Sequence, residues 1–141
     1  LLTYVLATGL AFAVLSEVSA DRVPLESLRG LFHRDPLLGL ALLVAALSLL
    51  GLPPLAGFWG KYLVFSEAAR VGAWGVLVLA LLTSAVSAYY YLALGLAPFQ
   101  KGEGQAAPRP LARGVALLVA LLLLLLGLFP GTLLPALAAG G

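Results

Sequence analysis

The chain has 141 residues, of which 62% are hydrophobic and 10% are charged, with a formal net charge of +2. A soluble domain of this length carries about 25% charged residues, so the composition indicates an integral membrane protein, and the small net charge gives no reason to expect nucleic-acid binding. The absence of cysteine and the single histidine, His33, predict no cofactor and no metal site in this chain.

Residues 1–17 form the first predicted helix, which is apolar up to Ser16 and Glu17. A membrane-crossing helix needs about 20 apolar residues. The sequence opens inside this apolar run, contains no methionine and lacks the basic start of a signal peptide. We therefore expect an excerpt from a longer membrane protein.

Residues 18–35 form a linker with apolar side chains at helical spacing among charged residues. These are Leu25, Leu28, Leu31 and Phe32. This pattern predicts an amphipathic segment that lies along the membrane surface.

Residues 36–70 are too long for one straight helix, which would extend about 50 Å through an apolar core of about 30 Å. The motif GLPPLAG breaks the helix, because Pro53 and Pro54 remove backbone donors and push the preceding residues out of the helical region. We expect the break at about 51–57. The segment is then either a hairpin of two short helices or one span broken mid-membrane.

The positive charges favour the single broken span, since lysine and arginine in short loops gather on the cytoplasmic side. A hairpin would divide them four against four. A broken span leaves Arg70 alone on the outer side and places six on the other, namely Arg22, Arg29, Arg34, Lys101, Arg109 and Arg113. The loops 18–35 and 98–111 would be cytoplasmic, and both chain ends external.

Lys61 lies nine residues before Arg70, so about 13 Å of helix separates it from the outer interface. Ionisable residues at that depth cost free energy and mark functional sites. Desolvation disfavours the charged form of an amine, which lowers its pKa toward the range in which it can exchange a proton. We predict proton transfer by Lys61. The structural alternative is a lysine that extends to the headgroups or pairs with Glu67. The residues predicted to form the break beside it are Pro53, Pro54, Gly57 and Gly60.

A third span is predicted over 73–97, where Thr83 and Ser87 share one face and Ser84 lies on the adjoining stripe. Small residues at this spacing favour close helix packing, and a hydrated wall beside Lys61 is the alternative. A polar loop over 98–111, a fourth helix over 112–129 and an external tail over 130–141 follow.

Two motifs resemble a known family. The run LSLLGLPPLAGFWGKYLVF at 47–65 resembles the antiporter-like membrane subunits of respiratory complex I, the proton-pumping NADH:quinone oxidoreductase. The run SAVSAYYYL at 84–92 is similar to its N-type subunit, the counterpart of mitochondrial subunit two. Multi-subunit (Mrp-type) cation/proton antiporters share the first motif.

The resemblance implies an all-α fold of fourteen transmembrane helices with two inverted five-helix repeats. The four spans here would be the C-terminal part of that fold, and 36–70 would be the second broken helix. Lys61 matches the lysine of the outward-leading proton half-channel. The family's other charged residues, a glutamate and two lysines, would lie upstream of Leu1.

From this resemblance we expect a proton-translocating subunit in the inner (cell) membrane that works with other membrane subunits of complex I, including neighbouring antiporter-like subunits. NADH, FMN, iron–sulfur clusters and quinone would bind in other subunits, and electron transfer there would drive proton movement here. The alternatives are a subunit of an Mrp-type antiporter and a non-transporting membrane scaffold.

Overall fold

The computed structural model describes residues 2–18, 25–102, 110–129 and 131, and all secondary structure in these ranges is helical. The predicted all-α class is confirmed. The long helices are α1 (Leu2–Val18), α3 (Pro36–Leu50), α4 (Ala56–Arg70), α5 (Trp74–Leu96) and α6 (Pro110–Leu128). The short ones are η1 (Leu25–Leu28), α2 (Leu31–Arg34) and η2 (Ala97–Phe99). Except for residue 131, the predicted external tail lies outside the described residues, as do parts of both predicted cytoplasmic loops.

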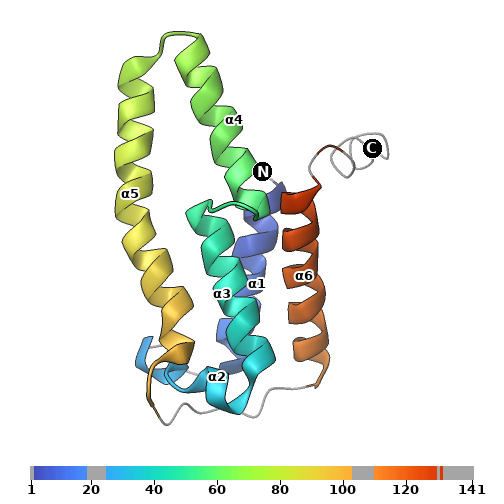
Figure 1. Cartoon of the computed structure of the whole chain (residues 1–141). Coiled ribbons are helices and arrows are strands. Elements are labelled where there is room, and N and C mark those ends of the chain that lie inside the picture. Colours follow the sequence, from blue (N-terminus) through green and yellow to red (C-terminus); the bar gives the residue numbers. More distant parts are fainter. Residues whose placement is uncertain (1, 19–24, 103–109, 130, 132–141) are drawn as a thin grey trace.

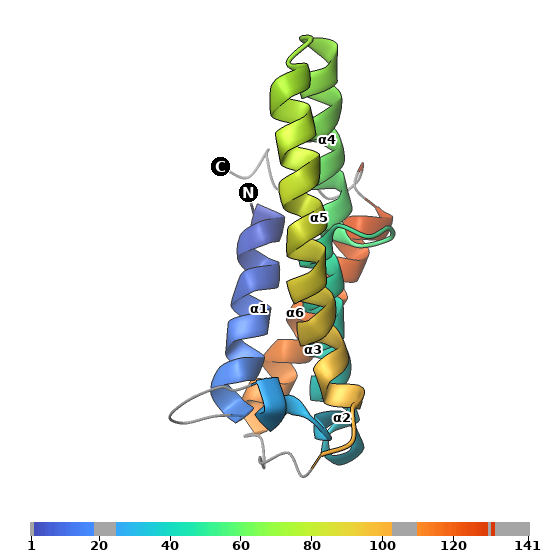
Figure 2. The same ribbon diagram turned by 90° about the vertical axis from the view of Figure 1, so that its left-hand side faces the viewer.

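The helices α1, α3 and α6 lie side by side, and the hairpin of α4 and α5 extends beyond them (Figure 1). After the break at 51–55, α4 continues away from the end of α3, turns at 71–73, and α5 returns along both (Figures 1 and 2). The break therefore lies about midway along the long axis of the molecule, with α5 running past it.

The buried core surrounds α3, which packs against α1, α5 and α6. Its fully buried side chains include Leu38, Leu42 and Ala45. Facing them are small and aliphatic residues of α1 and α6, namely Ala7, Leu10, Val14, Ala116 and Leu123. The α4–α5 hairpin instead leaves many apolar side chains exposed, as expected for a chain whose surroundings are apolar.

One helix among the described residues, Trp74–Phe99, is long and apolar enough to cross a membrane, with 26 residues and a mean hydropathy of 1.8. Three shorter apolar helices cover Tyr4–Ser16, Pro36–Leu50 and Arg113–Leu128. The helices α3 and α4 have 15 residues each, or about 22 Å, so neither alone matches an apolar core of about 30 Å.

The helix α3 begins at a buried carboxylate. Asp35 is 2% exposed, and its Oδ1 accepts a hydrogen bond from the Leu38 amide at 3.3 Å. Pro36 occupies the first turn, where its missing amide hydrogen costs nothing. The Asp35 Oδ2 accepts a second bond from Arg113 Nε of α6 at 2.9 Å. This ion pair joins the starts of α3 and α6.

The connections before α3 and after α5 meet at the same end of the molecule. The Gly30 amide donates to the Gln100 carbonyl at 2.8 Å, and Gly102 lies against the backbone of Arg29. The predicted amphipathic segment is divided at Gly30, whose φ of 80° separates η1 from α2. Its Leu28 and Leu31 are buried, while His33 is exposed.

Candidate functional site

The end of α3 is closed by a Schellman motif centred on Gly51. With φ at 85°, Gly51 donates to the Ser48 carbonyl at 3.1 Å, and Leu52 donates to the Leu47 carbonyl at 3.2 Å. This pattern satisfies two of the carbonyls that a helix C-terminus leaves open. Pro53 and Pro54 follow, joined by a cis peptide, and are exposed.

Lys61 closes the same helix end from across the break. Its Nζ donates to the carbonyl of Leu50, the last residue of α3, at 2.8 Å. A lysine on α4 can reach back this way because helical side chains point toward the N-terminus of their own helix. The ammonium thus lies at the negative end of the α3 dipole.

Glu67 does not hold Lys61, because Arg70 takes that carboxylate. Arg70 Nε donates to Glu67 Oε2 at 2.8 Å at the exposed end of α4. Within the ranges that the structure describes, Lys61 forms no ion pair. The lysine is half-buried and has a backbone carbonyl as its partner.

Ser48 caps the start of α4 in return. The Gly57 amide donates to Ser48 Oγ at 3.2 Å. The two helices approach so closely here that a Cβ on Gly57 would lie 1.7 Å from the Ser48 carbonyl oxygen. The residue types therefore fit a reciprocal arrangement, in which α3 supplies the hydroxyl for α4 and α4 supplies the ammonium for α3.

The end of α6 packs against the break through its backbone. Trp59 Nε1 donates to the Gly127 carbonyl at 2.8 Å. A Cβ on Gly127 would lie 1.8 Å from the Pro54 carbonyl oxygen. This apolar helix thus packs against both the break and the first turn of α4.

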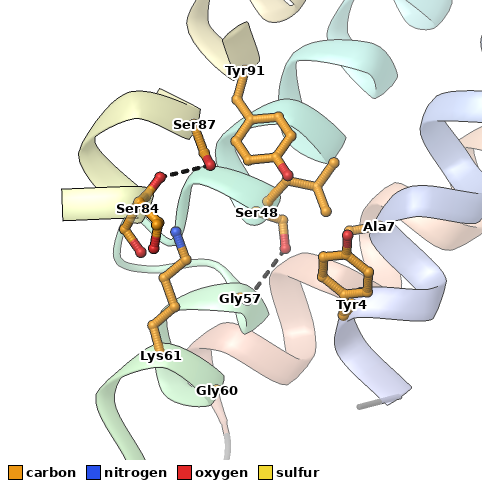
Figure 3. Close-up of a pocket in the computed structure, with 11 residues that line it drawn as sticks. Tyr4, Ala7, Ser48, Gly57, Gly60, Lys61, Ser84, Ser87 and Tyr91 are labelled. Atoms are coloured by element: carbon orange, nitrogen blue, oxygen red, sulfur yellow. Dashed lines mark hydrogen bonds between the residues drawn. The ribbon is translucent and has the colours of Figure 1, made fainter. Parts of the chain in front are cut away.

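A cavity of about 300 Å³ lies beside Lys61 (Figure 3). Of the residues predicted from sequence, it is lined by Gly57, Gly60, Lys61, Thr83, Ser84 and Ser87. Figure 3 shows the Lys61 amine directed toward Ser84 and Ser87 of α5, and the hydroxyl of Ser48 between α3 and α4. Pro53 and Pro54 are not among the lining residues.

The α5 hydroxyls also bond within their own helix. Thr83 Oγ1 donates to the Leu79 carbonyl at 3.0 Å, and Ser87 Oγ donates to the Thr83 carbonyl at 2.8 Å. Their oxygens still offer lone pairs to the cavity. Close packing occurs further along α5, where a Cβ on Gly95 would lie 2.9 Å from Ala46 of α3. The hydroxyl groups of α5 thus line the cavity, whereas its close contact with α3 lies at Gly95.

Tyr4, Ser48 and Tyr91 line this cavity as well, and sequence analysis missed them as site residues. Tyr91 comes from α5, as do Thr83, Ser84 and Ser87. Ser48 could have been recognised from the sequence, because it is the single polar side chain in PLLGLALLVAALSLL. Tyr4 belongs to another helix, so no local pattern connects it to Lys61.

A second cavity of about 480 Å³ shares Lys61 and Ser84 with the first and continues along α4 and α5 toward Phe65 and Leu77. Its other lining includes Phe58, Tyr62, Phe65 and Ser66. Lys61 therefore lies between a cavity rich in hydroxyl groups and one lined mainly by aromatic and aliphatic side chains.

A metal centre has no support in the part of the chain that the structure describes, where no three histidine, cysteine or acidic side chains cluster. A lysine at a helix break, next to a hydroxyl-lined cavity in an apolar bundle, is the type of site found in ion transporters. The fold and the site thus have the features of a membrane transport protein.

Comparison with known proteins assigns the chain to a family. Residues 1–87 match the family model described as NADH:quinone oxidoreductase/Mrp antiporter, TM, so the chain belongs to this family of transmembrane subunits. It is 73% identical over its whole length to NADH-quinone oxidoreductase subunit 14 of Thermus thermophilus, of which it covers 34%. It is 43% identical to subunit N 1 of Streptomyces griseus, of which it covers 30%.

The fold is similar to that of a solved chain of respiratory complex I from Thermus thermophilus with bound aureothin. The TM-score is 0.86 at 71% identity, and the match covers 99% of this chain and 33% of that one. The predicted N-type resemblance is confirmed. The chain spans about a third of the length of these relatives.

Proposed function

We propose that this chain is the C-terminal part of a proton-translocating subunit of NADH:quinone oxidoreductase, and that Lys61 transfers protons within it. The observation that carries the proposal is an amine between two cavities, held by a backbone carbonyl and not by a carboxylate. Such an amine can lose its proton without leaving a buried counter-charge behind.

The depth of the site supports this role. Ser84 lies ten residues from Trp74 and fifteen from Phe99, the ends of the membrane-length helix. These separations correspond to about 15 and 22 Å, so the cavity beside Lys61 falls near the middle of an apolar core of about 30 Å.

We further propose four membrane spans, with α3 and α4 together forming the broken one. The contact between the 25–34 and 97–102 segments supports a common side for the two loops. Arg29, Arg34 and Lys101 lie in these segments and Arg113 binds Asp35 next to them, whereas Arg70 is the last residue of α4, whose end lies at the opposite end of the molecule (Figure 1). By the positive-inside rule the loops would be cytoplasmic and the chain ends external.

The cofactors and partners follow from the family and not from residues of this chain. NADH, FMN, iron–sulfur clusters and quinone would bind in other subunits of the complex. Neighbouring membrane subunits and lipid would cover the apolar faces of α4 and α5. Protons would reach Lys61 from the hydroxyl-lined cavity and leave along the α4–α5 hairpin toward the outside.

The test is Lys61→Met in the assembled complex, reconstituted into sealed vesicles. We expect NADH-driven proton translocation to fall at least about tenfold, the effect of removing a positioned proton-transfer group, with assembly preserved. Lys101→Met is the matched control, since Lys101 is exposed on the 97–102 segment. Proton translocation in Lys61→Met equal to that in Lys101→Met would contradict the proposal.

The second candidate is a subunit of an Mrp-type antiporter, which the family description also covers. The relatives named above are all NADH-quinone oxidoreductase subunits, which favours the first candidate. Purification of the native complex separates the two. Flavin, iron–sulfur clusters and quinone reductase activity in the preparation indicate complex I, and their absence together with Na⁺/H⁺ exchange indicates an antiporter.

A further inference from the structure

Gly51 touches the proposed proton-transfer lysine at the point where α3 ends. The aliphatic stem of Lys61 crosses the break directly over Gly51, and its Nζ binds the carbonyl of the preceding residue, Leu50. A Cβ built on Gly51 would lie 2.8 Å from Lys61 Cδ and 3.3 Å from Cε. Both distances are shorter than ordinary carbon–carbon contacts.

The conflict would fall on the lysine and not on the backbone. Gly51 is fixed by its two hydrogen bonds to the last turn of α3, whereas the Lys61 stem has rotatable bonds. The stem would turn aside, and its amine would leave the Leu50 carbonyl. Glycine at position 51 thus serves two purposes, because it permits a φ of 85° and leaves room for the lysine.

We propose that Gly51 is a positioning residue for Lys61. By lacking a side chain, it lets the lysine cross the break and holds the amine on the Leu50 carbonyl, between the two cavities. This inference rests on the proposed function of Lys61 for its consequence in transport, but the positioning itself can be measured separately.

The chain offers a matched control in Gly72, which lies in the α4–α5 turn. Its φ is 72°, close to that of Gly51, and a Cβ there would have no atom within 4 Å. Gly51→Ala and Gly72→Ala therefore carry a similar backbone cost for a left-handed conformation. Only the first places a carbon against Lys61.

The experiment compares the two variants in the assembled complex. In a high-resolution map we expect Gly72→Ala to retain the Lys61–Leu50 hydrogen bond and Gly51→Ala to lose it. Proton translocation in vesicles should fall about tenfold in Gly51→Ala relative to Gly72→Ala, as loss of a hydrogen bond to a charged group implies. An unchanged amine position, or equal translocation in the two variants, would overturn the inference.

A double-mutant cycle separates positioning from a general loss of stability. In the Lys61→Ala background the stem is absent, so Gly51→Ala should shift the thermal midpoint of the complex less than it does with Lys61 present. Gly72→Ala should shift it equally in both backgrounds. Equal shifts for Gly51→Ala in both backgrounds would assign Gly51 to the turn alone and refute its action on Lys61.

If Gly51→Ala does not assemble, Gly51→Asn keeps the Cβ with a residue that adopts the left-handed region more readily, and Gly72→Asn is its control. Normal proton translocation in Lys61→Met refutes the proposed function, whereas the map and the cycle still decide the positioning. Loss of translocation in Lys61→Met together with parental behaviour of Gly51→Ala refutes the inference and leaves the function intact.

Discussion

The two ends of α3 are both closed by charged side chains, but in opposite ways. At the first end, the Asp35 carboxylate caps the helix and is paired with Arg113, so the charge is fully compensated. At the second end, the Lys61 ammonium binds the Leu50 carbonyl, and no carboxylate joins it within the described residues. A charge in an ion pair is suited to holding helices together. A charge bound only by a helix dipole is suited to proton exchange.

Among the changes that test this comparison, Gly57→Ala at the second end of α3 is expected to have the largest effect. The added Cβ would lie 1.7 Å from the Ser48 carbonyl oxygen, and the backbone on both sides would have to separate. We expect a loss of about 3 kcal/mol or more, as for severe overpacking, together with loss of proton translocation. Thermal unfolding of the complex and vesicle assays measure the two.

Gly75→Ala is the matched control for that change. Gly75 lies in the first turn of α5, and a Cβ there would meet no atom within 4 Å. Alanine is the better helix former, so this variant should be at least as stable as the parent. Similar destabilisation in both variants would show that the close approach of α3 and α4 is not what Gly57 provides.

The next largest effect is expected at the first end, from Asp35→Asn. This change removes the charge that compensates Arg113 and weakens the cap of α3. We expect about 2–4 kcal/mol of destabilisation, with proton translocation per assembled complex preserved. The readouts are the thermal midpoint and vesicle translocation normalised to complex abundance.

The double variant Asp35→Asn/Arg113→Gln sharpens this prediction. Removing both charges leaves no unpaired ion, so the double variant should be less destabilised than the sum of its single changes. A stable Asp35→Asn complex that no longer translocates protons would instead place Asp35 in the pathway and erase the distinction between the two ends of α3.

The smallest expected effect is that of Ser48→Ala. The Gly57 amide would lose its cap, which costs about 1 kcal/mol, while Lys61 and Leu50 remain in place. Ser16→Ala is the control, since that hydroxyl is exposed, bonds to the Ala13 carbonyl of its own helix and lines neither cavity beside Lys61. A loss of translocation in Ser48→Ala as large as that in Lys61→Met would make Ser48 a functional group and not a capping group.

Local patterns in the sequence predict much of the fold. Hydropathy predicts the apolar helices, and the Pro53–Pro54 pair predicts a break because proline lacks a backbone donor and pushes the residue before it out of the helical region. The structure has its helix boundaries at Leu50 and Ala56. Helical periodicity places Thr83 and Ser87 on one face and Ser84 on the adjoining stripe, and all three line the same cavity.

The partners of these residues depend on tertiary structure. Glu67 is the sequence-local choice for Lys61, yet Arg70 lies closer along the exposed end of the helix and takes it. The contacts of Trp59 with Gly127, and of Asp35 with Arg113, join residues 68 and 78 positions apart. No periodicity encodes such separations.

The sequence by itself therefore determined the helical class, the break and the presence of an amine beside it, because these depend on local backbone sterics and on hydrophobic patterning. Three contacts depend on the tertiary structure alone. Lys61 donates to the Leu50 carbonyl, Ser48 accepts a hydrogen bond from the Gly57 amide, and the end of α6 packs against the break. Those outcomes depend on which helices lie within a few ångströms of one another, and packing of the whole bundle sets that distance.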